Sequence, residues 1–321
     1  MKACVVKELS GPSGMSYEDV PDAAGGSGNV VIDVRAAGVC FPDLLLTKGE
    51  YQLKLPPPFV PGMEVAGVVR SAPDSSGFAV GQRVSAFTMM GGYAEQVAVA
   101  PDHVVPTADG LDDAEAAALL GNYYTMYFAL ERRGALRRGE TVLVLGSAGG
   151  VGTAAIQIAK ALGATVIAMV HRPQAMDYVS TLGADVVLPL TDGWAQAVRD
   201  ATDGRGVDLV VDPVGGAAFD DAIRVIATEG RLLVIGFAAG GIPTVKVNRL
   251  LLRNVAVVGV GYGEFVNRTP GAQLQIGAGL GALVAAGLRP PPPIRFPLNE
   301  GQAALQSLGD GGVLGKLVLE P

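Results

Sequence analysis

The sequence predicts an α/β protein in which a parallel sheet, covered by helices on both faces, is inserted in a second, mostly β domain. Two observations carry this prediction. Between residues 119 and 262, short apolar runs alternate with stretches long enough for a helix, whereas the first hundred residues are broken by Gly and Pro and hold few helical patterns. The chain has 321 residues, of which 49% are hydrophobic, so it can bury two cores.

The α/β part rests on six apolar runs of strand length with Gly or Pro at most of the joints between them. The runs are 141–145, 165–170, 185–190, 207–212, 231–236 and 255–260. Continuous apolar strands that alternate with helices are typical of a parallel sheet buried on both faces. Six strands in this rhythm predict a doubly wound sheet.

The flanking regions predict the second domain. Residues 29–39 and 93–100 resemble strands, and the proline-rich stretch 53–69 suits a strand after a stiff entry. The C-terminal region contains a proline-rich crossing, a helix near 299–308 and a last strand, which we expect to return to the β domain. The expected boundaries are 1–118 for the first part of the β domain, 119–262 for the inserted domain and 263–321 for the returning part. We expect a functional site in the cleft between the domains.

Charge and composition exclude several classes of partner. The net charge is −7 and only 17% of residues are charged, which disfavours binding to nucleic acid or to an anionic membrane. No apolar run is long enough to span a bilayer. The start, "MKACVVKELSG", lacks a secretory pattern. The chain has two cysteines, Cys4 and Cys40. We therefore expect a cytoplasmic protein with two free thiols.

The stretch "GSAGGVG", which follows the first strand of the α/β part, has the pattern of a phosphate-binding turn. Gly146 ends the strand, and Gly149 and Gly150 let backbone N–H groups approach a pyrophosphate. Gly152 allows close packing of the helix that follows, whose N-terminus favours an anion. Placed between a strand and a helix in a six-strand repeat, this turn predicts a dinucleotide-binding (Rossmann) domain rather than a tight turn alone.

The end of the second strand of the α/β part indicates which dinucleotide is bound. An NAD site would place an acidic residue there to bind the ribose hydroxyls. This chain has His171 and Arg172 instead, with no acid before Asp177. An arginine can bind a 2′-phosphate through two charge-assisted hydrogen bonds. The sequence therefore favours NADP, with a solvated surface arginine as the alternative.

Missing motifs narrow the chemistry. The histidines are His103 and His171, so a zinc site that needs several histidines is excluded. No tyrosine is followed four residues later by lysine, and no Gly-x-Ser-x-Gly elbow occurs. The reaction should therefore come from the cofactor, with the protein supplying position and polarity. Hydride transfer to an acceptor that is already electrophilic fits this set of residues.

The chain resembles the zinc-free branch of the medium-chain dehydrogenase/reductase superfamily, the NADPH:quinone oxidoreductases related to ζ-crystallin. The resemblance covers nearly the whole chain, and it implies a GroES-like β domain around the Rossmann domain. It rests on "AAGVCFPDLLLTKGEY" (36–51), "PFVPGMEVAGVV" (58–69), "AAALLGNYYTMYFAL" (116–130), "SAGGVGTAAIQIAKALGA" (147–164), "GVDLVVDPVGG" (206–216) and "GKLVLE" (315–320).

Two positions argue for the zinc-free branch. Zinc-dependent relatives carry a Cys-His pair and a later Gly-His-Glu motif, whereas here Phe41 follows Cys40 and Met63 stands before Glu64. The catalytic metal site is therefore expected to be absent. Asp43 and Glu64 match acidic positions of the superfamily and are interpreted as structural.

The resemblance also implies site residues. The cofactor contacts carry over to Thr125, Gly149, Gly150, Val151, Gly152, Val214, Phe237, Val260 and Tyr262. His171 and Arg172 are cofactor candidates from the end of the second strand, where this chain departs from the Ser/Lys set of its relatives. On the substrate side it points to Tyr51 and Cys40 as catalytic candidates, with Asn122 and Tyr262 as substrate contacts. Tyr51 could donate a hydrogen bond to a carbonyl that becomes negative as hydride arrives, or it could simply fill the edge of the β core.

The predicted function is an NADPH-dependent reductase that passes hydride to a quinone or another electrophilic enone without metal or flavin. The first alternative is an enoyl- or acrylyl-CoA-type thioester reductase, which would need a basic patch for the CoA phosphates. The second alternative is a non-enzymatic NADPH-binding protein. The resemblance further implies a homodimer that pairs through the last strand of the sheet, "VAVVGV".

Overall fold

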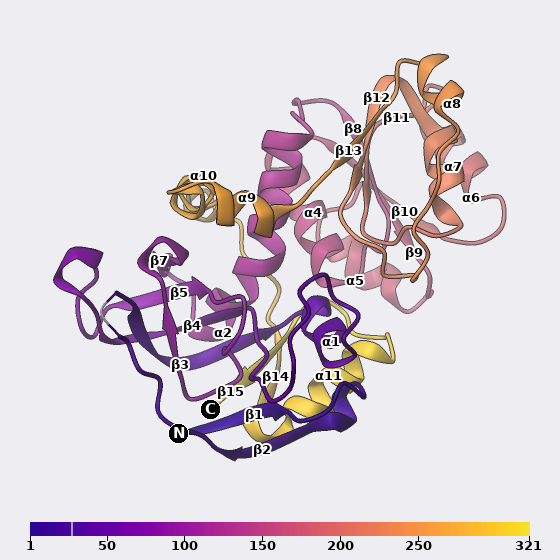
Figure 1. The fold of residues 1–321 in the computed structure, drawn as a ribbon. Helices are drawn as coiled ribbons and strands as arrows, with labels where there is room; N and C mark the ends of the chain where they lie inside the picture. The colour runs from indigo at the N-terminus through magenta and orange to yellow at the C-terminus, as the bar shows by residue number, and fades with distance from the viewer. Residues whose placement is uncertain (27) are drawn as a thin grey trace. The chain divides into compact units, whose positions relative to one another are not determined.

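A computed structural model describes residues 1–26 and 28–321 of the chain (Figure 1). The chain forms two compact units. The β unit comprises Met1–Gly121, Thr269–Ala285 and Arg289–Pro321, and the α/β unit comprises Asn122–Arg268 and Ala286–Leu288. The β unit is therefore built from three separate segments of the chain, and most of the α/β unit lies between the first two.

The α/β unit contains a six-stranded sheet in the order β10-β9-β8-β11-β12-β13, and each neighbouring pair is parallel. Its strands are β8 (Thr141–Val144), β9 (Thr165–Val170), β10 (Val186–Pro189), β11 (Val207–Asp212), β12 (Ile226–Val234) and β13 (Ala256–Gly259). The strand order reverses direction between β8 and β11, as it does in doubly wound sheets. Each strand overlaps one of the six predicted apolar runs.

Helices cover both faces of this sheet. Helices α4 (Gly150–Ala161) and α5 (Ala175–Thr181) lie on one face, and α6 (Trp194–Asp200), α7 (Ala218–Val225) and α8 (Val247–Leu251) lie on the other (Figure 1). Because both faces are covered, central strand residues such as Leu143 and Val210 are fully buried. The predicted doubly wound fold is confirmed.

The β unit is built on a second sheet in the order β14-β15-β3-β4-β5-β7, with β6 paired to β3. Its strands are β3 (Val30–Val39), β4 (Glu64–Ser71), β5 (Arg83–Phe87), β6 (Gln96–Val99), β7 (Val104–Pro106), β14 (Ile294–Pro297) and β15 (Leu317–Glu320), beside a hairpin of β1 (Lys2–Val6) and β2 (Met15–Asp19). Its helices are α1 (Phe41–Thr47), α2 (Asp113–Leu119), α10 (Ala272–Ala285) and α11 (Gly301–Gly309).

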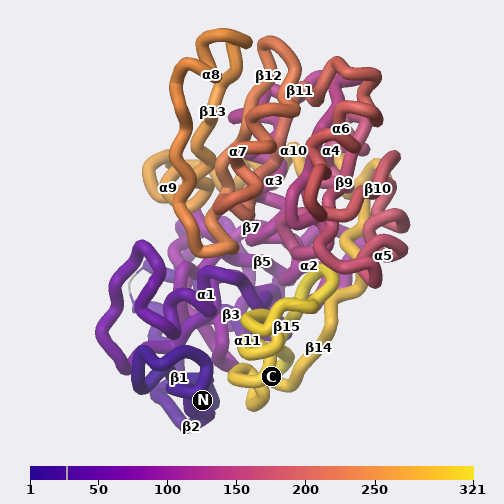
Figure 2. Tube along the Cα trace, turned by 90° about the vertical axis from the view of Figure 1, so that its right-hand side faces the viewer, coloured from indigo at the N-terminus to yellow at the C-terminus, as the bar shows by residue number. Residues whose placement is uncertain are grey.

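The C-terminal segment completes the β unit. Strand β15 pairs antiparallel with β3, with Leu317 opposite Val39, and β14 runs parallel to β15. Figure 2 shows this yellow segment beside the indigo and violet strands from the first part of the chain. The sequence predicts a return to the β domain with a helix and a last strand, and α11 and β15 fill these places. Strand β14 was missed because it follows four consecutive prolines.

The remaining helical segments are short. The 3₁₀ helices are η1 (Pro12–Gly14), η2 (Asp74–Ser76), η3 (Pro101–His103) and η6 (Leu298–Glu300). The π-helical segments are η4 (Leu120–Tyr124) and η5 (Phe128–Arg133), with α3 (Thr125–Tyr127) between them, and α9 spans Tyr262–Arg268.

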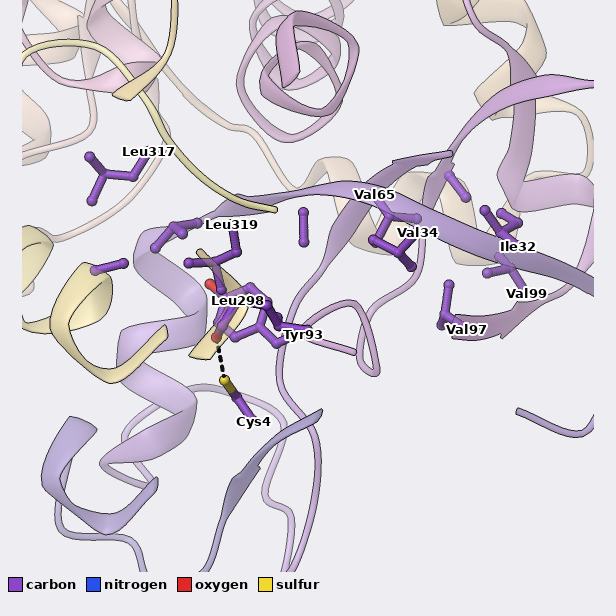
Figure 3. Close-up of a cluster of buried hydrophobic side chains, with 14 of the residues drawn as sticks. Cys4, Ile32, Val34, Val65, Tyr93, Val97, Val99, Leu298, Leu317 and Leu319 are labelled. Carbon is purple, nitrogen blue, oxygen red and sulfur yellow. Dashed lines mark hydrogen bonds between the residues drawn. The ribbon is translucent and has the colours of Figure 1, made fainter. Parts of the chain in front are cut away.

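The core of the β unit holds apolar side chains from both ends of the chain. Ile32 and Val65 pack with Leu319 and with the fully buried Tyr93 (Figure 3). Cys4 belongs to the same cluster, and its thiol donates a hydrogen bond to the Leu298 carbonyl oxygen at 3.0 Å. Tyr93 is the one labelled side chain of Figure 3 that carries a hydroxyl. This hydroxyl donates a hydrogen bond to the buried carboxylate of Asp43.

Candidate functional site

A glycine turn connects β8 to α4 in the α/β unit. Gly146 has a φ of +60°, which an L side chain adopts only with strain, so the chain can turn sharply at the end of the strand. The Ser147 hydroxyl donates to the Val144 carbonyl oxygen at 2.8 Å and fixes the turn. Helix α4 then begins at Gly150.

The glycines of this turn differ in what surrounds them. A Cβ on Gly152 would lie 2.3 Å from the Gly146 carbonyl oxygen, so the first turn of α4 packs directly on the loop backbone. A Cβ on Gly150 would lie 2.2 Å from Nδ2 of Asn122, so this glycine makes room for the amide. A Cβ on Gly149 would meet nothing closer than 3.7 Å. The backbone at Gly149 is therefore open to a ligand, whereas Gly150 and Gly152 serve internal packing.

The N-terminus of α4 favours an anion. The helix has twelve residues, carries no acidic residue in its first turn and lacks a side-chain N-cap at Gly149. Its first N–H groups, which include those of Gly150 and the half-buried Val151, have no partner within the helix. The aligned peptide dipoles add a partial positive charge at the same end. Asn122 lies against this end and adds amide hydrogens, so the arrangement suits a pyrophosphate.

Further predicted cofactor contacts follow the neighbouring strands. A Cβ on Gly146 would lie 3.1 Å from the Val214 side chain, which places the residues after β11 against the glycine turn. Phe237 follows β12 and is 39% exposed, and the N–H of Val260 donates to the Val234 carbonyl oxygen just after β13. These residues all stand at the carboxyl ends of parallel strands, the edge where such sheets bind ligands.

Asp212 holds the loop after β11 and was not singled out from the sequence. Its side chain is 1% exposed and accepts hydrogen bonds from the N–H groups of Val214 at 2.9 Å and Gly215 at 2.8 Å. Burial raises the pKa of this carboxyl although the two hydrogen bonds oppose the shift. The sequence signal that could have identified Asp212 is its position at the end of an apolar strand.

His171 and Arg172 follow β9, the strand beside β8. Both are exposed. The Arg172 carbonyl accepts the N–H of Ala175 at the start of α5. Within residues 1–26 and 28–321, no acidic side chain pairs with the Arg172 guanidinium. This group therefore remains available to a phosphate.

An aromatic cluster accounts for Tyr262. Its ring is 5% exposed and packs against Tyr124, at 6.4 Å between ring centroids, and against Phe128, at 5.9 Å. Thr125 is half-buried and begins α3, which packs on α4. Tyr123 is also buried, and its hydroxyl donates to Gln157 on α4 at 2.6 Å. The tyrosine rings therefore contribute packing, and Thr125 lies on the segment that packs against α4.

In the β unit, Cys40, Glu64 and Lys316 form a buried triangle of side chains, which we call the charge triangle. The Lys316 ammonium donates to the Cys40 sulfur at 3.1 Å and pairs with Oε1 of Glu64, and the Cys40 thiol donates to the same oxygen at 3.1 Å. Oε2 of Glu64 accepts the N–H of Gly121. Lys316, which the sequence alone did not single out, is 8% exposed, and Glu64 is 0% exposed.

The charge triangle depends on close backbone approach. A Cβ on Gly38 would lie 2.2 Å from Oε1 of Glu64, and one on Gly121 would lie 3.0 Å from Oε2. Burial lowers the pKa of Lys316, but Cys40 and Glu64 beside it outweigh burial and raise this pKa above its usual value. Lys316 therefore remains a cation inside the β unit.

A second buried acid, Asp43, organises the backbone next to Cys40. Its carboxylate accepts hydrogen bonds from the N–H groups of Cys40 at 2.9 Å and Gly62 at 3.2 Å, and from the Tyr93 hydroxyl at 2.9 Å. The expectation that Asp43 and Glu64 are structural agrees with these contacts. Burial raises the pKa of Asp43 to about 6, even though the hydrogen bonds favour the carboxylate.

The raised pKa of Asp43 predicts a pH-dependent stability. An aspartate titrates near 3.9 in the unfolded chain, so the folded state binds its proton more tightly. This contribution to stability is present below about pH 4 and is lost as the pH rises through about 6, by about 3 kcal/mol for two pKa units. We expect the unfolding free energy of wild type minus that of Asp43→Asn to fall by this amount between about pH 4 and pH 7 in urea denaturation. A difference that stays constant would contradict the shift.

Tyr51 and Met63 belong to an apolar cluster beside the charge triangle. Met63 is 3% exposed and packs with Leu46 and Phe87, and the half-buried Tyr51 packs against the same group. Burial, together with the nearby acids Asp43 and Cys40, raises the pKa of Tyr51. Its hydroxyl has no hydrogen-bond partner in the described part of the chain, so it remains able to donate one. Both readings of Tyr51, packing and donation, are compatible with this position.

No group of three or more His, Cys, Asp and Glu side chains among the described residues is arranged to hold a metal ion. The same residues contain no helix long and apolar enough to cross a membrane.

Two family patterns match the chain, the alcohol dehydrogenase GroES-like domain over residues 26–109 and the zinc-binding dehydrogenase domain over residues 150–275. The quinone oxidoreductase of Rattus norvegicus is 30% identical over 99% of this chain and 97% of its own length. A probable oxidoreductase from Mycobacterium abscessus is 60% identical, with a TM-score of 0.93 over 100% of this chain and 99% of that one. The quinone oxidoreductase of Thermus thermophilus, solved also with NADPH, is 37% identical, with a TM-score of 0.85 over the whole of both chains.

Proposed function

The chain belongs to the quinone oxidoreductase-like family of medium-chain dehydrogenases/reductases and is an oxidoreductase of that type, and we propose that it uses NADPH to reduce a quinone or another electrophilic enone without zinc. The observation that carries this proposal is the glycine turn. It presents open backbone at Gly149 beside the N-terminus of α4, and Arg172 follows the neighbouring strand unpaired.

The residues of the α/β unit fit a dinucleotide phosphate. Gly150, Val151 and Asn122 offer N–H groups at the positive end of α4, where a pyrophosphate is stabilised, and Gly149 leaves the approach open. Asn122 thus supports the cofactor, although the sequence assigned it to the substrate. Thr125, Val214, Phe237 and Val260 provide further contacts in this proposal. NADPH, when bound, supplies the hydride, and the protein orients it and excludes water.

Independence from zinc is supported by the donor atoms of the β unit. A metal bound by Cys40 and Glu64 would have to occupy the place where the Lys316 ammonium contacts both side chains. Met63 stands where zinc-dependent relatives carry histidine, and it is packed among apolar side chains. The cation of this site is therefore supplied by the chain itself.

On the acceptor side, the candidates remain Tyr51 and Cys40. Hydride transfer to a quinone or enone leaves an oxygen that gains negative charge, which a hydroxyl donor stabilises. The Tyr51 hydroxyl is free to act in this way, whereas the Cys40 thiol is already engaged by Glu64. We therefore propose that Tyr51 donates a hydrogen bond to the acceptor oxygen and that Cys40 lines the acceptor site without reacting.

Arg172→Ala should weaken NADPH binding and leave NADH binding unchanged. Loss of charge-assisted hydrogen bonds to the 2′-phosphate costs about 1.5–3 kcal/mol, which corresponds to roughly a ten- to hundred-fold loss of affinity. Fluorescence titration with both nucleotides measures the two affinities in one variant. Equal losses for NADPH and NADH would remove Arg172 from the cofactor site.

The function itself is tested by initial rates of NADPH and NADH oxidation with a simple ortho-quinone, using chelator-treated protein. Rapid oxidation of NADPH with little use of NADH supports the proposal. Inactivity with quinones but turnover of an enoyl thioester would favour the thioester reductase instead. Tight NADPH binding without turnover of any acceptor would favour a binding role.

We also propose a homodimer that pairs through β13. This strand is the last of its sheet, so its outer edge has no neighbouring strand in the described chain. Exposed apolar side chains occur in and just after α8, which precedes this strand in the chain, namely Val247, Leu251 and Leu252, each at least 73% exposed. An unpaired strand edge and exposed apolar side chains both favour association with a second copy.

Leu252→Glu should convert this dimer to a monomer. A two-fold interface contains the residue twice, so the loss of apolar burial amounts to about 3 kcal/mol or more, a weakening of at least about a hundred-fold. Sedimentation velocity measures the change. Val80→Glu, at a 72% exposed position of the β unit, is the matched control and should leave the mass unaltered. A wild-type monomer at micromolar concentration would refute the proposed dimer.

A further inference from the structure

The charge triangle places one thiol between two opposite charges. The Cys40 S–H points to the Glu64 carboxylate, and the sulfur accepts a hydrogen bond from the Lys316 ammonium. All three side chains are at most 8% exposed, so water screens their interactions weakly. The carboxylate favours the protonated thiol, whereas the ammonium favours the thiolate.

We propose that Glu64 is a positioning residue that keeps Cys40 as a neutral, unreactive thiol, and that Cys40 and Lys316 would otherwise form a thiolate–ammonium pair. The proposal rests on a shared contact. The Lys316 ammonium contacts both the Cys40 sulfur and the Glu64 carboxylate, and the carboxylate balances the charge of the ammonium.

The acidities of the three groups decide which of them loses a proton when Glu64 is neutralised. If Glu64 loses its charge, the buried ammonium of Lys316 is left without a counter-ion, which is costly. An ordinary thiol has a pKa of about 8.5 and an ordinary lysine about 10.4, so the thiol is the group that loses a proton first. In the intact triangle, burial and Glu64 raise the pKa of Cys40 well above its usual value, although Lys316 opposes them.

Other ionisable groups near Cys40 do not replace Glu64. Asp43 on α1 binds the backbone N–H of Cys40, and its remaining contacts are Gly62 and the Tyr93 hydroxyl. Tyr51 is neutral at physiological pH because its pKa is raised further. Among the described residues, Glu64 is therefore the one acid that accepts a hydrogen bond from the sulfur.

The arrangement has a chemical consequence for the proposed function. A thiolate adds to the β-carbon of an enone or quinone, where a sulfur–carbon bond forms and the α-carbon takes a proton from water. A neutral thiol reacts far more slowly, since the thiolate is the nucleophile. This consequence rests on the proposed function, whereas the charge relation among the three side chains does not.

The test compares alkylation of wild type and Glu64→Gln by iodoacetamide, in which a sulfur–carbon bond forms and iodide leaves. We expect Cys40 of the variant to react at least about ten-fold faster at about pH 7, because one pKa unit changes the thiolate fraction about ten-fold. Peptide mass spectrometry separates the two cysteines. Cys4, which is 3% exposed and lies in the core of the same unit, serves as the reporter of unfolding.

The matched control is the double variant Glu64→Gln/Lys316→Met, which removes both charges. Its Cys40 should react at a rate within a few-fold of wild type, because no cation remains to stabilise the thiolate. Equal, rapid alkylation of the single and double variants would show that packing rather than charge protects the thiol, and would overturn the proposal. So would a Glu64→Gln variant whose Cys40 reacts no faster while Cys4 stays protected.

A measurement without any change at the triangle covers the case in which Glu64→Gln unfolds and both cysteines react. In a Cys4→Ser background, the ultraviolet absorbance of the thiolate reports Cys40 alone. We expect no thiolate between about pH 6 and pH 8. A thiolate signal at about pH 7 would overturn the proposal. Neither experiment requires NADPH or an acceptor, so failure here is distinct from failure of the proposed function.

Discussion

The Lys316→Met variant should unfold with a free energy about 3–5 kcal/mol lower than that of the wild-type protein. The change removes the ammonium and leaves the Glu64 carboxylate at 0% exposure, where its remaining donors among the described residues are the Cys40 thiol and the Gly121 N–H. A buried charge without its counter-ion is among the few single changes that cost this much. Urea denaturation followed by circular dichroism measures the loss.

An exposed ion pair provides the matched control for Lys316. Lys2 pairs with Asp19 at 2.7 Å, but these side chains are 43% and 79% exposed. Lys2→Met should therefore cost less than about 1 kcal/mol. The double variant Glu64→Gln/Lys316→Met should recover most of the loss, because it buries no unpaired charge. If the double variant is as unstable as Lys316→Met, the cost comes from packing and not from charge.

Gly152→Ala should disrupt the glycine turn whether or not a cofactor is present. The new Cβ would lie 2.3 Å from the Gly146 carbonyl oxygen and 2.5 Å from the Ser147 Cα. Both are backbone atoms, so the loop or the start of α4 has to move. We expect a loss of about 2–4 kcal/mol in unfolding free energy together with the loss of measurable NADPH binding.

Gly149→Ala is the informative counterpart. Its φ is −79°, and the Cβ would meet nothing closer than 3.7 Å, so the variant should fold with nearly wild-type stability. If a pyrophosphate approaches this backbone, the same Cβ stands in its way, and NADPH affinity should fall at least about ten-fold. Thermal unfolding with and without NADPH separates the two effects. Normal NADPH affinity in Gly149→Ala would place the phosphates elsewhere.

The α/β unit was predictable because its strands are buried on both faces. Such strands appear as continuous apolar runs, and the six runs recovered every strand of this sheet. The glycine turn was also recognisable, since Gly146 and Gly152 have backbone requirements that no other residue meets. The sequence did not distinguish the task of Gly150, because its neighbour Asn122 comes from a distant position in the chain.

The charge triangle was not predictable for a similar reason. Cys40 and Glu64 stand out in the sequence because they match motif positions of the superfamily, but Lys316, which contacts both side chains, is 276 residues away from Cys40. A lone lysine before a C-terminal strand is usually solvated, and no local pattern distinguishes Lys316 from such a residue. Strand β14 was hidden in the same way by the prolines before it. Pairing with β15 stabilises β14 as a strand, which its own local sequence does not favour.

The pairing of β15 with β3 bears on the order in which the chain folds as it leaves the ribosome. The α/β unit is drawn almost entirely from Asn122–Arg268, so its residues are all synthesised before the segment that contains Lys316. That unit can fold while the first sheet still lacks β14, β15 and the cation that Glu64 requires. During this interval the Glu64 side chain has to remain hydrated. The edge of β3 that pairs with β15 therefore stays open until after the α/β unit has been synthesised.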